Sequence, residues 1–153
     1  MSELVLRFPV PPDRDAKGRP QFPPKGQNAL DAMHWAVLTR YKHAWQDAVL
    51  TAWRQLPAGE QVRVAGQQVT VALTIPVTTA RRRDAHGWVA LFKLVWDGLR
   101  CPEPRKGRPS CRATWPQDCA HPWPDDDERY LLGVPAIAFE KGASEVVLRI
   151  TTV

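Results

Sequence analysis

Apolar side chains in this sequence change their spacing along the chain, and this change constrains the fold more than any other feature. Over residues 69–75 they alternate with small or polar side chains, the two-residue period of a strand with one buried face. We therefore expect a strand within 61–77 that ends at Pro76. Residues 31–56 and 85–100 instead repeat apolar side chains about every 3.6 residues, the period of an amphipathic helix.

The ends of these elements carry recognisable signals. Asp31 is expected to cap the first helix, and Pro57-Ala58-Gly59 is expected to end it. Near the start of the chain, a short apolar run at residues 4–8 is stopped by prolines, which predicts a first strand.

Two further apolar runs close the chain. Residues 131–139 and 146–153 flank a Lys-Gly-Ala-Ser turn at 141–144, the pattern of a β-hairpin. The elements thus follow the order β, α, β, α, long loop, β, β. This order predicts an α/β (α+β) sandwich, a small mixed β-sheet with two main helices packed on it. A length of 153 residues predicts a single domain, residues 1–153.

The charge balance of the chain is basic. Its 21 lysines and arginines oppose 16 aspartates and glutamates, a formal net charge of +5, which favours a polyanionic partner. No apolar run approaches the about 18 residues of a transmembrane helix, so no membrane partner is expected. The first residues show no basic segment followed by an apolar one, and we therefore expect a cytoplasmic protein.

Seven tryptophans are many for a chain of this length. Trp35, Trp45 and Trp53 fall on the apolar stripe of the first expected helix, and core packing is the leading interpretation. An aromatic surface that stacks nucleobases is the alternative.

Residues 100–124 break every periodicity and contain six prolines. All three cysteines lie there with one histidine: Cys101, Cys111, Cys119 and His121. Three thiolates and an imidazole are a ligand set for tetrahedral Zn²⁺, so a structural zinc ion is one hypothesis. The spacing lacks a Cys-x2-Cys pair, and free thiols in a basic loop are the other hypothesis.

Two charged segments could form one site. Residues 81–84 read Arg-Arg-Arg-Asp at a strand-to-helix junction, and residues 125–127 read Asp-Asp-Asp. Clustered carboxylates suit hard divalent cations such as Mg²⁺, and an ion held there can activate a phosphodiester for hydrolysis. Arginines beside them would hold the phosphate backbone. A solvated turn and an acidic loop are the alternative.

Several short motifs follow one another along nearly the whole chain. They are Phe8-Pro9-Val10-Pro11-Pro12, Asn28 with His34-Trp35, Lys42-His43-Ala44-Trp45, Arg82-Arg83-Asp84, Lys93 four residues before Asp97-Gly98-Leu99, and Trp123-Pro124-Asp125-Asp126. In this order they resemble the RusA family of Holliday-junction resolvases, in particular its Trp-rich versions. The family usually passes from the Asp-Gly-Leu motif to the Trp-x-Asp-Asp motif in a few residues, so residues 100–122 are expected to be an inserted loop.

The resemblance implies a homodimeric endonuclease of DNA recombination and repair that cuts four-way junctions with Mg²⁺ or Mn²⁺. Asp84 and Asp126 would be catalytic metal ligands, with Asp125 and His86 completing the metal set. His86 stands where relatives often have a second carboxylate, and imidazole favours Mn²⁺ over Mg²⁺. Lys93 would be catalytic at the scissile phosphate. Contacts to the DNA backbone are expected from Arg81, Arg82, Arg83, Arg105, Lys106 and Arg108.

Two other functions stay open at this stage. A catalytically weakened protein would bind branched DNA without cutting it. A small interaction protein with accidental motif matches would show no preference for branched over linear DNA. Cleavage of a synthetic four-way junction, measured beside binding, separates the three.

Overall fold

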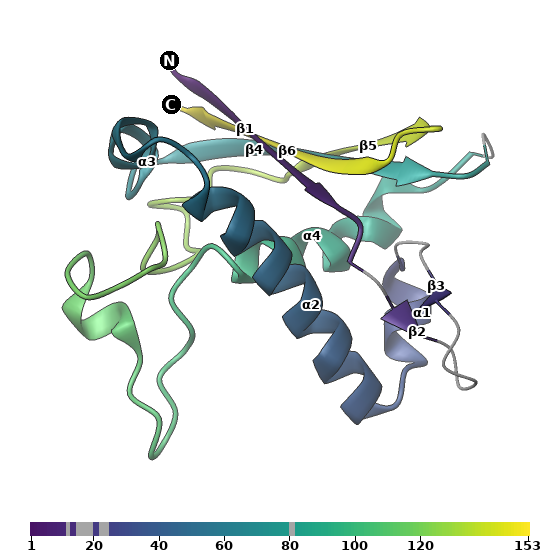
Figure 1. The fold of residues 1–153 in the computed structure, drawn as a ribbon, viewed down its shortest axis with the longest axis horizontal. Coiled ribbons are helices and arrows are strands. Elements are labelled where there is room, and N and C mark those ends of the chain that lie inside the picture. The colour runs from purple at the N-terminus through teal and green to yellow at the C-terminus, as the bar shows by residue number, and fades with distance from the viewer. Residues whose placement is uncertain (12, 15–19, 22–24, 80–81) are drawn as a thin grey trace.

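The fold, a computed structural model, is a mixed four-stranded sheet with helices packed against one face (Figure 1). The structure describes residues 1–11, 13–14, 20–21, 25–79 and 82–153. The strands of the main sheet are β1 (Glu3–Pro9), β4 (Val69–Val77), β5 (Ala136–Lys141) and β6 (Glu145–Thr152), in the order β1-β6-β4-β5. The two-residue strands β2 (Asp13–Arg14) and β3 (Pro20–Gln21) pair with each other. The expected α+β class is confirmed.

The closing hairpin predicted from the sequence is wrong, because β5 and β6 do not pair. β6 lies between β1 and β4 and is antiparallel to both, whereas β5 runs parallel to β4 at the edge of the sheet. The turn at 141–144 crosses the end of β4, where the Gly142 N–H donates to the Val77 carbonyl at 3.2 Å. Burial explains the order, since half of the residues of β6 are buried, which suits a central position, while every residue of β5 is exposed or half-buried.

The first expected helix divides into two, and a third follows it. α1 (Gln27–Asp31) ends at the residue expected to begin the helix, and His34 caps α2 (Trp35–Arg54) by accepting the Ala36 N–H on Nδ1 at 3.3 Å. α3 (Ala58–Val64) occupies the start of the expected strand region, so residues 61–64 are helical. The strand itself starts at Val69 and runs past Pro76 by one residue.

The second expected helix also begins later and ends earlier. A 3-10 turn, η1 (Ala85–Trp88), leads into α4 (Val89–Asp97), and a second 3-10 turn, η2 (Cys111–Thr114), lies in the long loop. Gly98, the C-cap residue that follows α4, lies against α2. A β-carbon at Gly98 would come within 2.7 Å of the Gln46 backbone, so the close approach of the two helices requires glycine there.

Four of the tryptophans lie in the core between the sheet and the helices: Trp45, Trp53, Trp96 and Trp123. The ring of Trp123 contacts Trp96 with centroids 4.8 Å apart and Trp53 with centroids 5.6 Å apart. Trp123 thereby anchors the end of the long loop to α2 and α4. Trp35 was predicted to be core and is not, because it is the first residue of α2 and its side chain is 73% exposed.

Within the described part of the chain, no helix is long and apolar enough to cross a membrane.

Candidate functional site

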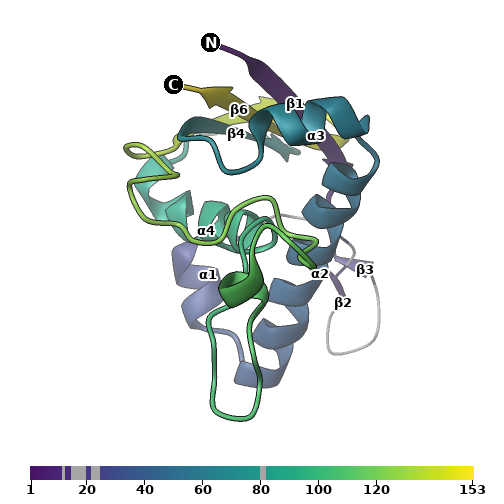
Figure 2. The same cartoon turned by 90° about the vertical axis from the view of Figure 1, so that its left-hand side faces the viewer.

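The long loop leaves the body of the protein after α4 and returns at Trp123 (Figure 2). Its two ends are joined by backbone hydrogen bonds. The Cys101 N–H donates to the Trp123 carbonyl at 2.8 Å, and the Trp123 N–H donates to the Leu99 carbonyl at 3.2 Å. Because Leu99, Cys101 and Trp123 are buried, the base of the loop belongs to the core.

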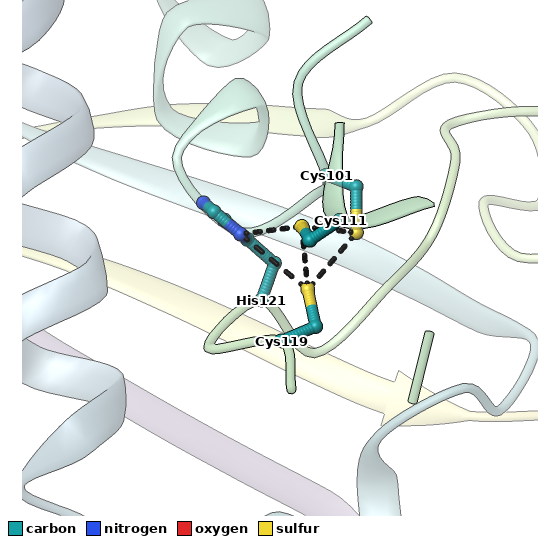
Figure 3. A group of neighbouring side chains, drawn as sticks. All are labelled: Cys101, Cys111, Cys119 and His121. Atoms are coloured by element: carbon teal, nitrogen blue, oxygen red, sulfur yellow. Dashed lines mark hydrogen bonds between the residues drawn. The ribbon is translucent and has the colours of Figure 1, made fainter. Parts of the chain in front are cut away.

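Cys101, Cys111, Cys119 and His121 converge at that base (Figure 3). The sulfur of Cys111 lies 3.0 Å from that of Cys101 and 2.6 Å from that of Cys119. His121 Nδ1 lies 3.4 Å from the Cys111 sulfur and 3.7 Å from the Cys119 sulfur. All three cysteines are free thiols. One potential ligand atom from each residue falls within 4.8 Å of the others, so the cluster can hold a metal ion.

The protonation of the cluster responds to burial. Burial, reinforced by the neighbouring thiols, raises the pKa of Cys101, and burial also raises the pKa of Cys111. Burial, followed by the positive charge of Arg54, lowers the pKa of His121. The imidazole is therefore neutral near pH 7, the form that binds metals. The Cys101 and Cys111 thiols therefore remain protonated until a cation displaces their protons.

Hydrogen bonds from residues near the cysteine cluster fix the long loop to the rest of the protein. Trp115 Nε1 donates to the His121 carbonyl at 3.1 Å, and the Gly66 N–H donates to the Pro122 carbonyl at 3.0 Å. Ser110 caps η2 by accepting the Arg112 N–H, and its hydroxyl also donates to the Pro102 carbonyl. The cluster thus sits in a loop fastened to the segment that precedes β4.

Lys93 and Asp126 meet beside this loop. Lys93 Nζ lies 3.3 Å from Asp126 Oδ2, and the Arg100 guanidinium approaches the same oxygen at 3.5 Å. Arg100 Nε also donates to Asp97 Oδ1 at 2.7 Å. Burial alone would raise the pKa of Asp126, but the charges of Arg100 and Lys93 reverse the effect and lower it. Asp126 is therefore ionised at neutral pH.

A second arginine, Arg112, contacts the neighbouring carboxylate of Asp125. Arg112 Nη1 lies 3.4 Å from Asp125 Oδ2, and Arg112 Nε donates to the Pro124 carbonyl at 3.0 Å. The Asp126 N–H donates to Asp125 Oδ1 at 2.8 Å. Sequence reasoning missed Arg100 and Arg112 as site residues. Arg100 had a usable signal, its position three residues after Asp97 at a helix end, whereas nothing local linked Arg112 to Asp125.

Asp84 lies in a different setting. Its carboxylate accepts the His86 N–H at 3.0 Å and so caps η1, and both residues are exposed. It lines an open pocket of ≈ 440 Å³ formed by the start of α1, the residues just before η1 and the end of η1, with lining residues Gly26, Gln27, Asn28, Ala29, Arg82, Arg83, Asp84, Gly87 and Trp88. Asn28 and the Arg-Arg-Asp motif, distant in sequence, therefore face one pocket.

The predicted metal carboxylates do not gather closely. Among the described residues, Cys101, Cys111, Cys119 and His121 are the only group of three or more His, Cys, Asp or Glu side chains arranged to hold an ion. Asp84 and His86 thus do not form such a group with Asp125 and Asp126. The structure brings together Lys93 and Asp126, and it brings together the four residues of the cysteine cluster.

The arginines and lysine predicted to contact DNA differ in exposure and in their contacts within the protein. Arg82 is exposed at the pocket, whereas the Arg83 guanidinium donates to Thr79 O at 2.9 Å and lies over the Phe139 ring, 5.6 Å from its centroid. Arg81 lies outside the described residues. The tip of the long loop is a tight turn in which Arg105 and Arg108 pair through their backbones. Its exposed cations are Arg105, Lys106 and Arg108.

No protein-family model matches this chain, and no curated protein matches it either.

Proposed function

We propose that this protein is a structure-selective DNA endonuclease of the RusA type, which resolves four-way junctions by divalent-metal-dependent phosphodiester hydrolysis. The contact between Lys93 and Asp126 carries this proposal. The two residues are 33 positions apart and come from two of the motifs on which the resemblance rests, and their charged atoms lie 3.3 Å apart. A carboxylate paired with an accessible lysine is an arrangement that phosphoryl chemistry uses.

The charges around Asp126 suit a bound phosphate. The side chain of Lys93 is 62% exposed, so its ammonium can reach a ligand while it stays near the carboxylate. Asp126 and Asp125 offer carboxylate oxygens, and Mg²⁺ binds through one or two carboxylates while keeping several waters. The donor chemistry therefore fits Mg²⁺ or Mn²⁺, and such an ion supplies Lewis acidity and an activated water. Lys93 would balance charge on the scissile phosphate.

The rest of the DNA would be held by exposed cations. Arg82 beside the pocket and the three basic residues of the loop tip lie on segments distant in sequence, as contacts to more than one arm of a junction require. We also propose that the protein acts as a homodimer, because paired nicks need two sites. The sheet face opposite the helices is covered by no described helix and is available for a second copy (Figure 1).

The cysteine cluster is proposed to hold a structural Zn²⁺. Tetrahedral bonds of the usual lengths would place sulfur and nitrogen ligands about 3.6 Å apart, and Nδ1 of His121 is 3.4 and 3.7 Å from two of the sulfurs. The sulfurs lie 2.6 to 3.1 Å apart, so an ion would spread them towards about 3.8 Å. They are also well beyond the about 2.05 Å of a disulfide.

One observation favours a second function, binding of branched DNA without cleavage. The Asp84 carboxylate caps η1, whereas the Asp126 carboxylate contacts Lys93 and Arg100. These two carboxylates therefore do not converge on one metal site. A protein that kept the basic surface and not the metal centre would recognise junctions only.

Incubation of a synthetic four-way junction with Mg²⁺ or Mn²⁺ tests both functions, with Asp126→Asn beside the wild type and binding measured in parallel. Asp127→Asn is the matched control, since Asp127 is the next carboxylate and pairs with Arg129 instead. Cleavage by the wild type and the control, with binding but no cleavage by Asp126→Asn, supports the endonuclease. Binding without cleavage by all three proteins supports the second function, and equal binding to linear DNA contradicts both.

A further inference from the structure

We propose that the metal in the cysteine cluster holds the Asp125–Asp126 pair in place, with Arg100 and Arg112 as the positioning residues that connect the two. The inference rests on the zinc site proposed above and does not require that the protein cleaves DNA. Two of the four ligands are directly adjacent in sequence to these arginines, and each arginine contacts a different aspartate.

The first connection runs through Cys101. Its backbone is fixed at both polar groups, because its N–H donates to Trp123 and its carbonyl accepts from Arg100 Nη1 at 3.3 Å. The same guanidinium extends to Asp126. A metal bound to the Cys101 sulfur would therefore restrain the segment from which Arg100 reaches the carboxylate.

The second connection runs through Cys111. Arg112 follows it in η2 and binds the 124–125 segment twice, through Nε to the Pro124 carbonyl and through Nη1 to Asp125. Arg112 Nη2 is buried and has no hydrogen-bond partner within the described part of the chain. This guanidinium is thus turned inward, and Arg112 is a positioning residue for Asp125, not a contact to solvent-borne phosphate.

Apart from the Trp115–Gly66 contact and the backbone hydrogen bonds at its base, the loop has few contacts that order it. Residues 102–109 are all exposed, and of residues 102–121 none is buried. With few apolar contacts to offset its conformational entropy, the loop depends on the cluster for a defined position. A metal held by three thiolates and a neutral imidazole also carries a net negative charge, which favours both arginines close by. Without the metal, the loop would move away from the 124–125 segment, and Arg112 would lose its contact with Asp125.

Hydrogen–deuterium exchange read by mass spectrometry tests this coupling without any use of nuclease activity. The zinc content of each sample is measured first. Chelation of the zinc-loaded wild type is expected to speed exchange in peptides covering 123–128 by roughly tenfold or more, the effect of losing a charge-assisted hydrogen bond. Peptides from β4 and β6 are expected to remain protected.

Arg112→Ala removes the contacts between the loop and the 124–125 segment while it leaves the four cluster residues unchanged. This variant should retain its zinc yet exchange faster than the wild type over 124–127, and chelation should then add less than it adds in the wild type, because only the connection through Arg100 remains. Arg112→Lys can restore one of the two contacts and should give an intermediate rate. Arg108→Ala, which removes an exposed arginine at the loop tip, is the matched control and should keep the wild-type zinc content and the wild-type exchange rate over 123–128.

The outcomes distinguish this inference from the proposals it builds on. Zinc present, with exchange over 123–128 unchanged by chelation or by Arg112→Ala, overturns the coupling alone. Protein purified without zinc and unable to bind it overturns the metal assignment and the coupling together. Absence of junction cleavage contradicts the endonuclease and leaves the exchange result to stand by itself.

Discussion

The indole of Trp115 lies directly over Gly66. A β-carbon at residue 66 would come within 2.5 Å of Trp115 Cη2, and Gly66 has a φ of +72°, a region that favours glycine. Through this contact the long loop packs against the turn between α3 and β4. A glycine outside the loop therefore affects the position of the cysteine cluster.

Gly66→Ala should therefore loosen the loop while the sheet and helices stay intact. The left-handed backbone alone costs about 1–2 kcal/mol for alanine, and displacement of Trp115 adds to it. We expect faster proteolysis within 102–118 and weaker zinc retention. Gly59→Ala is the control, because a β-carbon there meets nothing within 4 Å. Equal zinc retention and equal proteolysis in the two variants would contradict the prediction.

Cys111→Ser should release zinc and leave the core folded. The Cys111 sulfur lies 3.0 and 2.6 Å from the other two sulfurs and 3.4 Å from His121 Nδ1, so its loss removes one of the four potential ligands. Elemental analysis of protein purified without added metal should fall from about one zinc per chain to well below it. Arg105→Ser at the exposed loop tip is the control and should keep its zinc. Native thiols that all react freely with a reagent in the wild type would argue against a metal.

Asp84→Asn should lower junction cleavage by roughly 100-fold or more, the size of effect seen when one electrostatic group is removed from an active site. Asparagine caps helices about as well as aspartate, so the contact to the His86 N–H can persist and folding should be unaffected. Cleavage rates and junction affinity are compared with the wild type. Wild-type nicking by this variant would remove Asp84 from the site.

Lys93→Ala should slow cleavage and barely change the stability of the fold. The side chain is 62% exposed, and exposed substitutions usually stay within about 0.5 kcal/mol. Lys93→Arg keeps the charge and should recover part of the rate. Lys42→Ala, on α2, is the control for a general loss of positive charge. A cleavage rate unchanged by Lys93→Ala would end its catalytic assignment.

Junction affinity should fall steeply with salt, because each phosphate contact releases about 0.9 of a counterion. Arg82→Ala and a combined substitution of Arg105, Lys106 and Arg108 should each flatten the dependence of log affinity on log salt concentration. Arg83→Ala should flatten it less, since the Arg83 guanidinium already contacts Thr79 and Phe139. An affinity independent of salt would show that the basic surface does not bind nucleic acid.

Local patterns in the sequence were sufficient for several elements. The apolar periods located β1, β4, α2 and α4, because burial of one face depends on spacing along the chain. They failed at residues 61–64, since the helix there is only seven residues long and buries a single residue, Val64. They also failed at Trp35, because periodicity does not say how far a helix extends beyond the sheet it packs on.

The four residues of the cysteine cluster could be named from the sequence, because the ability of thiols and imidazole to bind a metal does not depend on the fold. The three cysteines and the histidine lie within one loop of 21 residues, so their side chains can meet at one point without help from distant segments. The partners of Asp125 and Asp126 could not be predicted in the same way. Arg112 reaches Asp125 because η2 folds back towards the end of the loop, which Trp123 holds beside Leu99 and Cys101 through backbone hydrogen bonds.

By itself, the sequence indicated the main strands and helices, the faces they bury and the side chains that could bind a metal, all of which follow from neighbours along the chain. Tertiary structure decided that β6 enters the sheet between β1 and β4, that β5 takes the edge, and that Lys93 meets Asp126. The physical reason is that strand pairing and ion pairs join segments whose proximity depends on how the whole core packs.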